Sequence, residues 1–154
     1  RDPPPEGWPG DWTPMPFWDE VVEGRAVTGH PPWEDYVPDR AERVQWYRFD
    51  DPPMRDDGTL DPFALAVLVD VMPGAAGELL GPDERTWFAP SIDLTLHVLG
   101  EARSGALLGH NTARWAGDGY CSADMALWDL GPDHRDEPRL VAYATQLFLF
   151  SFLD

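Results

Sequence analysis

The sequence predicts one α+β domain in which an antiparallel sheet curls around a single long buried helix. Residues 62–72 form the one convincing helical segment and are apolar on nearly every side. Most of the other segments are strand-like and are separated by turn residues. A lone apolar helix has only the sheet to pack against, so the sheet must curve around it. The pattern alone still leaves other α+β folds open.

Composition excludes several classes of function. The chain has 154 residues and a formal net charge of −17, with Arg as the only basic residue besides His. This acidic balance argues against binding nucleic acid or an anionic membrane surface. Cys121 is the only cysteine, so no intrachain disulfide can form, which fits a reducing cytoplasm. We expect a cytoplasmic protein with no signal peptide and no apolar run long enough to span a bilayer.

The chain divides into a short extension and one domain. Residues 1–16 are rich in Pro and Trp and are predicted to be an extended linker. The domain is expected to cover residues 17–154. Because the first residue is Arg1 rather than Met, we expect a processed product, an engineered product or a piece of a longer chain.

Strands are predicted before the helix at residues 17–30 and 41–49. Asp61 is the expected N-cap of the helix, with Pro62 at its first position, and Pro73-Gly74 is expected to end it.

Four further strand-like segments follow the helix, at residues 86–99, 106–117, 120–130 and 140–152. A hairpin turn is predicted at 117–119. In the first of these segments, alternation predicts one shared apolar face, formed by Ile92, Leu94, Leu96 and Val98.

Three stretches carry a resemblance to a known family. LDPFALAVLVD (60–70), APSIDLTLHV (89–98) and LVAYATQLFLF (140–150) resemble the thioesterase-like hotdog superfamily. The most similar type is acyl-CoA thioesterase II, a double-hotdog enzyme, and the likeness is to its C-terminal hotdog. The resemblance runs from about Phe17 to the C-terminus. It implies a hotdog fold, an acyl-CoA substrate and a second hotdog domain or chain as partner.

The same resemblance implies a set of catalytic residues. Enzymes of this type hydrolyse fatty acyl-CoA with an Asp, a Ser or Thr, and a Gln that position a water molecule. These residues correspond to Asp70 in the helix, Ser91 before Ile92-Asp93, and Gln146 in the last long strand. No cofactor and no metal are expected, because no pair of the four histidines has metal-ligand spacing with a third ligand.

Each of the three residues also has a structural interpretation. Asp70 in an apolar helix needs a partner if it is buried, or it meets solvent near the helix end. Gln146 is either a buried amide with partners or an outward-facing residue of an alternating strand. Ser91 either completes a water site or satisfies a turn at the start of a strand.

Alternative functions remain open. A hotdog hydratase or dehydratase would need a GDxNPxH-like Asp-His segment or a catalytic His before a helix start, and the sequence has neither. The other hypothesis is a non-catalytic hotdog half, which supports the fold and acyl tunnel of a thioesterase assembly. Neither Ser91 nor Cys121 has the setting of an activated nucleophile, so we expect an activated water and no covalent intermediate.

Overall fold

The computed structural model describes residues 21–30, 34–82, 87–132 and 136–152. The predicted linker at 1–16 lies outside these residues and stays a prediction. The described elements follow the chain in this order: β1 (Val22–Thr28), β2 (Glu42–Phe49), α2 (Pro62–Val69), α3 (Pro73–Leu80), β3 (Trp87–Phe88), β4 (Ser91–Val98), β5 (Ala106–Gly117), β6 (Tyr120–Asp129), β7 (Arg139–Leu149) and β8 (Ser151–Phe152).

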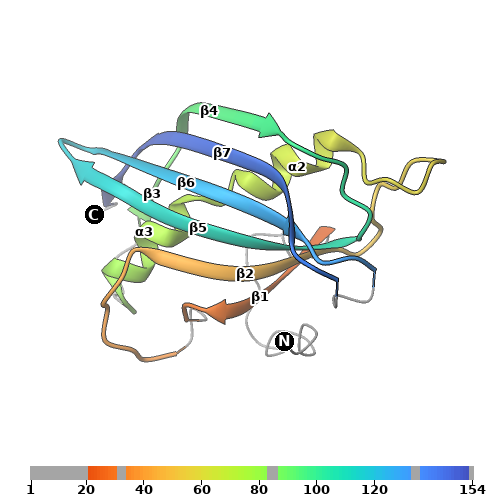
Figure 1. Cartoon of the computed structure of the whole chain (residues 1–154). Coiled ribbons are helices and arrows are strands. Elements are labelled where there is room, and N and C mark those ends of the chain that lie inside the picture. The colour runs from red at the N-terminus through yellow and green to blue at the C-terminus, as the bar shows by residue number, and fades with distance from the viewer. Residues whose placement is uncertain (1–20, 31–33, 83–86, 133–135, 153–154) are drawn as a thin grey trace.

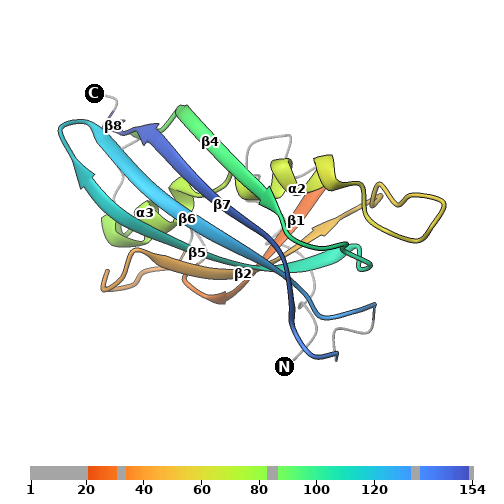
Figure 2. The same cartoon turned by 45° about the horizontal axis from the view of Figure 1, so that its top comes forward.

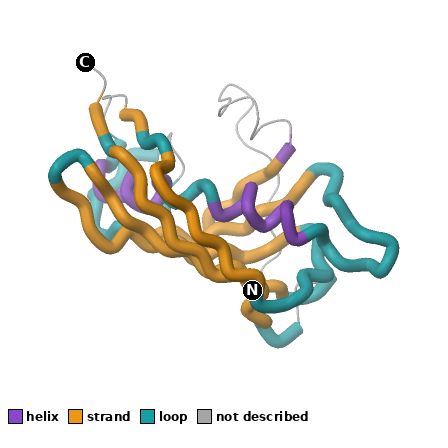
Figure 3. The backbone as a smooth tube through the Cα atoms, turned by 90° about the horizontal axis from the view of Figure 1, so that it is seen from above, coloured by secondary structure: helices purple, strands orange, loops and turns teal. Residues whose placement is uncertain are grey.

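Six strands form one antiparallel sheet in the order β1-β2-β5-β6-β7-β4. Both helices lie along the same side of this curved sheet, as Figure 1 and Figure 3 show. β3 and β8 pair separately as a short two-stranded sheet. This arrangement is the hotdog fold, so the predicted α+β class and the sheet wrapped around a long helical segment are confirmed.

The core lies between the helices and the concave face of the sheet. From the helical side, Leu65, Leu68 and Val69 of α2 are at most 2% exposed. From the sheet, Leu107, Met125, Val141, Ala144 and Phe148 are fully buried in the same cluster. Burying an apolar side chain of this size contributes roughly 1.5–3 kcal/mol relative to leaving it exposed. These contacts hold the helical segment against β5, β6 and β7.

The start of the helix is confirmed and its end is not. Asp61 caps α2 by accepting a hydrogen bond from the Phe63 amide, with Pro62 at the first position. α2 then ends at Val69, and Pro73 begins α3 rather than stopping the helix. Proline has no N–H to donate to the carbonyl four residues earlier, so the helix is interrupted before it. The interruption leaves a three-residue junction, Asp70–Met72, between two helices.

One expectation about burial was wrong. The helix is not buried all round, because Phe63 is 83% exposed. The apolar face predicted for residues 86–99 is only partly covered, since Ile92 and Val98 are each 51% exposed while Leu94 and Leu96 are half-buried. Both deviations lie at one edge of the sheet, where β4 has a neighbour on one side only.

The helical segment is longer than the sequence suggested. Pro62–Leu80 is long and apolar enough to cross a membrane by length and composition, contrary to the expectation that the chain has no such run. In the fold, its apolar side chains pack on the sheet, with Leu65 2%, Leu68 1% and Met72 0% exposed. A core helix of this kind passes the same test of length and composition as a membrane span.

Candidate functional site

Asp70 is the last residue of the helical turn that ends α2 and is its C-cap. Both structural interpretations of this residue hold in part, because the side chain is exposed and also has hydrogen-bond partners. The interruption before Pro73 places Asp70 beside the start of β4 and the middle of β7.

Gln146 lies on the inner face of β7 and is 2% exposed. It is therefore not the outward-facing residue of the alternative interpretation. Its Nε2 donates to Asp70 Oδ1 at 2.7 Å and to Ser91 Oγ at 2.6 Å. Because an ionised carboxylate only accepts, the amide nitrogen must be the atom that faces Asp70.

Ser91 is the first residue of β4. Its hydroxyl donates a hydrogen bond to Asp70 Oδ1 at 2.9 Å. The hydroxyl proton is therefore bonded to the carboxylate and not to a backbone group of a turn. The structure thus brings together all three residues that the sequence singled out, from a helix end and two neighbouring strands.

The hydrogen bonds leave one carboxylate oxygen available. Asp70 Oδ1 accepts from both Ser91 and Gln146, whereas Oδ2 has no hydrogen-bond partner in the described part of the chain. Gln146 uses both amide hydrogens within the trio, and its buried Oε1 has no partner among the described residues. The only hydroxyl proton of Ser91 is also used. The trio of Asp70, Ser91 and Gln146 therefore offers hydrogen-bond acceptors to an incoming molecule, because its N–H and O–H donors are already used in bonds within the trio.

The site opens at the edge of the sheet. Both Asp70 and Ser91 are exposed, and Figure 2 shows α2 lying next to β4, the last strand of the sheet. Exposed apolar side chains lie on the same two elements, namely Phe63 on α2 and Ile92 and Val98 on β4. Within the described residues, the site is therefore open to solvent on this side.

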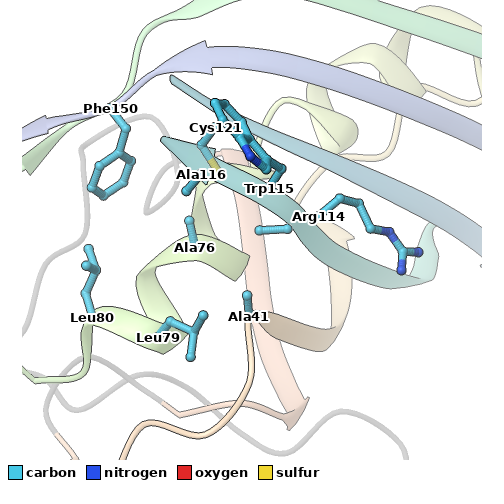
Figure 4. Close-up of a pocket in the computed structure, with 10 residues that line it drawn as sticks. Ala41, Ala76, Leu79, Leu80, Arg114, Trp115, Ala116, Cys121 and Phe150 are labelled. Carbon is cyan, nitrogen blue, oxygen red and sulfur yellow. The ribbon is translucent and has the colours of Figure 1, made fainter. Parts of the chain in front are cut away.

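A separate apolar pocket lies between α3 and the hairpin of β5 and β6. Its cavity volume is about 320 Å³, and none of its lining residues belongs to the trio. Figure 4 shows Phe150 and Cys121 on the sheet side and Leu79 and Leu80 on the α3 side. Burial raises the pKa of the Cys121 thiol. A thiol with a raised pKa is protonated at neutral pH and is a poor nucleophile.

The described residues contain no group of three or more His, Cys, Asp or Glu side chains that could hold a metal ion. His110 pairs with Glu42, its Nε2 lying 2.6 Å from Oε1. His30 contacts the buried carboxylate of Glu78. His134 lies outside the described residues.

A buried polar cluster around Glu78 of α3 was not predicted from the sequence. Glu78 is 4% exposed, and its Oε1 accepts from Arg43 Nε at 2.7 Å. His30 Nδ1 lies 3.0 Å from Glu78 Oε2, and the His30 ring stacks on Tyr36 with centroids 3.8 Å apart. A Glu within the small and apolar stretch GAAGELL was the available signal. The cluster ties the connection between β1 and β2 to α3.

Comparison with known proteins agrees with this architecture. A thioesterase-family protein from Silicibacter pomeroyi superposes with a TM-score of 0.68 at 14% identity, over 90% of this chain and 91% of that one. A thioesterase from Haemophilus influenzae gives 0.62 at 14% identity, over 88% and 82%. These two likenesses concern the fold. A search of curated protein sequences found no match.

A further neighbour has a longer chain. This protein of Novosphingobium aromaticivorans, described provisionally as a thioesterase, is 25% identical with a TM-score of 0.60. The likeness covers 86% of this chain but only 44% of that chain. The family model for the acyl-CoA thioesterase C-terminal domain matches residues 1–150. The chain therefore belongs to the acyl-CoA thioesterase C-terminal domain family, whose general chemistry is thioester hydrolysis.

Proposed function

We propose that this chain carries the hydrolytic site of an acyl-CoA thioesterase, which releases a free fatty acid and CoA by means of an activated water. One observation carries the proposal above all others. Asp70, Ser91 and Gln146 come from distant parts of the sequence and yet share hydrogen bonds of 2.6–2.9 Å.

Asp70 acts as the general base in this proposal. Two donors hold its Oδ1, which fixes the direction of Oδ2, the oxygen that accepts a proton from water. The water oxygen then adds to the thioester carbonyl, and the tetrahedral intermediate breaks its C–S bond. The thiolate is a good leaving group, so no strong acid is required at this step.

Ser91 and Gln146 have different duties. Ser91 is exposed, and its Oγ has a lone pair left to accept the second hydrogen of the water. Gln146 is buried and donates one hydrogen bond to Asp70 and one to Ser91. It therefore orients the water indirectly, by holding these two side chains in place. The hydrogen bonds favour this duty over donation to the thioester carbonyl, for which Gln146 has no free N–H.

A second hotdog domain or chain completes the site. The support is the open edge at β4, where exposed backbone and apolar side chains adjoin the exposed Asp70 and Ser91. The 44% coverage of the Novosphingobium chain also fits a protein with room for two such domains. We infer a cytoplasmic assembly, without nucleic acid or a membrane span.

The test is hydrolysis of a medium-chain acyl-CoA by this chain alone and together with a second hotdog. Release of CoA is followed with a thiol reagent, and the Asp70→Asn variant is the matched inactive form. Activity that depends on Asp70 supports the proposal. Activity that requires the partner and is indifferent to Asp70→Asn would instead identify this chain as the non-catalytic half that supports the fold and the acyl tunnel.

A further inference from the structure

The junction between α2 and α3 carries Asp70 and needs a fixed position if Asp70 is to act. In Figure 3 the junction is the short link between the two helices above the sheet. Its Val71 and Met72 carbonyls accept from the Gly74 and Ala75 amides at 3.0 and 3.1 Å. These bonds are local, and they fix the shape of the junction without fixing its place over the sheet.

Asn111 connects this junction to the sheet. It lies in β5, is 1% exposed, and its Nδ2 lies 3.1 Å from the Met72 carbonyl oxygen and 3.4 Å from that of Val71. Its Oδ1 is buried and has no partner among the described residues. A buried amide oxygen without a partner lowers stability by roughly 1–3 kcal/mol. The side-chain hydrogen bonds that Asn111 does make are both directed at the junction.

Strand register relates Asn111 to the proposed site. Asn111 pairs with Met125 of β6, which pairs with Ala144 of β7, two residues before Gln146. With strands about 4.8 Å apart, Asn111 and Gln146 are separated laterally by roughly 10 Å. The two amides therefore hold the same junction from different strands, Gln146 by the Asp70 carboxylate and Asn111 by the backbone that follows it.

We propose that Asn111 is a positioning residue for hydrolysis: it holds the Asp70–Met72 junction where Asp70 Oδ1 meets Ser91 and Gln146. This inference rests on the proposed role of Asp70 as the base. Asn111 itself touches no reacting atom. Its effect on the rate passes entirely through the place and direction of the Asp70 carboxylate.

The structure lets this role be separated from a contribution to stability. In an Asn111→Leu variant, the Val71 and Met72 carbonyls keep their bonds to Gly74 and Ala75. The substitution also removes the unpartnered Oδ1 while keeping a similar branched shape. We therefore expect the melting temperature to change little while the junction loses its side-chain hydrogen bonds to β5.

The experiment is a double-mutant cycle in the full chain, within the assembly in which it is active. Asn111→Leu should lower kcat on a medium-chain acyl-CoA by up to about 10²-fold, the typical cost of a misplaced catalytic group, with KM nearly unchanged. In the Asp70→Asn background, the same substitution should change kcat by less than about twofold, because Asp70 is no longer there to be positioned. Thr112→Val, at the next position of β5, is the matched control and should keep wild-type kcat.

Each outcome separates the inference from the proposed function. Full kcat in Asn111→Leu, with Asp70→Asn inactive, overturns the positioning role and leaves the base assignment intact. Equal losses from Asn111→Leu in both backgrounds also overturn it, since they indicate a general structural effect. Full activity in Asp70→Asn contradicts the proposed function itself. If Asn111→Leu does not fold, Asn111→Ala goes through the same cycle with the same criteria.

Discussion

Gln146 Nε2 lies 2.7 Å from Asp70 Oδ1, although the two residues are 76 positions apart in the chain. The contact joins the end of α2 to the inner face of β7. Asp70 follows directly after α2, and the sheet that carries Gln146 curves around the helical segment. The proposed chemistry depends on this pairing.

Replacing the base should remove most of the activity. Asp70→Asn keeps the shape of the side chain but cannot accept the proton, so kcat should fall by roughly 10²–10⁴-fold. The melting temperature should be nearly unchanged, because Asp70 is exposed. Asp93→Asn removes the same charge from the nearby exposed face of β4 and should keep wild-type kcat. Full activity of a folded Asp70→Asn protein would exclude Asp70 as the base.

Replacing the positioning amide should cost a comparable or smaller factor. Gln146→Ala leaves the Asp70 carboxylate but removes the N–H groups that donate to Asp70 and to Ser91. We therefore expect kcat to fall by up to roughly 10²–10⁴-fold. Some loss of stability is also expected, since Gln146 is 2% exposed. Thr145→Ala, at the outward-facing neighbouring position of β7, serves as the control for steady-state kinetics. A kcat for Gln146→Ala equal to that of the wild type would remove Gln146 from the site.

The reaction should proceed without an acyl-enzyme. Ser91→Ala should retain part of the activity, with a loss of roughly 10–10²-fold, as expected for one hydrogen bond to a carboxylate. A serine nucleophile would instead be indispensable. Rapid quenching followed by intact-protein mass spectrometry should detect no acyl adduct. An adduct on Ser91 would defeat the mechanism by requiring a nucleophile where we infer only an acceptor for water.

The Cys121 thiol should be unreactive and dispensable. Burial raises its pKa, so the reactive thiolate forms only at higher pH than for a free cysteine. Iodoacetamide labelling of the native protein should therefore be slow at neutral pH and rise with pH, with a midpoint above that of the unfolded protein. Cys121→Ala should keep wild-type kcat. Rapid labelling at neutral pH that abolishes activity would point to a role for this thiol in catalysis.

The edge formed by α2 and β4 should be an interface. Phe63 is 83% exposed on α2, and Phe63→Asp should shift the assembly toward monomer in analytical ultracentrifugation. The physical reason is that a charge cannot be buried unpaired against an apolar partner surface. Val37→Asp, at a position 87% exposed in the connection between β1 and β2, is the matched control and should leave the assembly intact. A wild-type protein that is already a stable monomer would contradict the predicted pairing.

The sequence by itself determined the α+β class, most strand positions and the start of the helix. Strands at 41–49, 106–117 and 120–130 match β2, β5 and β6 within a residue. Periodicity and turn residues are local signals, and so is the Asp61-Pro62 start, which needs only the next few residues. The three site residues were identified through a family resemblance, which already contains tertiary information from other proteins.

Only the tertiary structure decided where the helix breaks, which apolar residues stay exposed and how the site residues meet. Pro73-Gly74 is compatible with either an end or a new start, and packing of Ala75 and Glu78 on the sheet favours the start of α3. Phe63 and Ile92 have the chemistry of core residues but lie at an edge where β4 pairs, among the described strands, with β7 alone. Asn111 gave no sequence signal at all, because its significance comes from two carbonyls some 40 residues away that only folding brings within its reach.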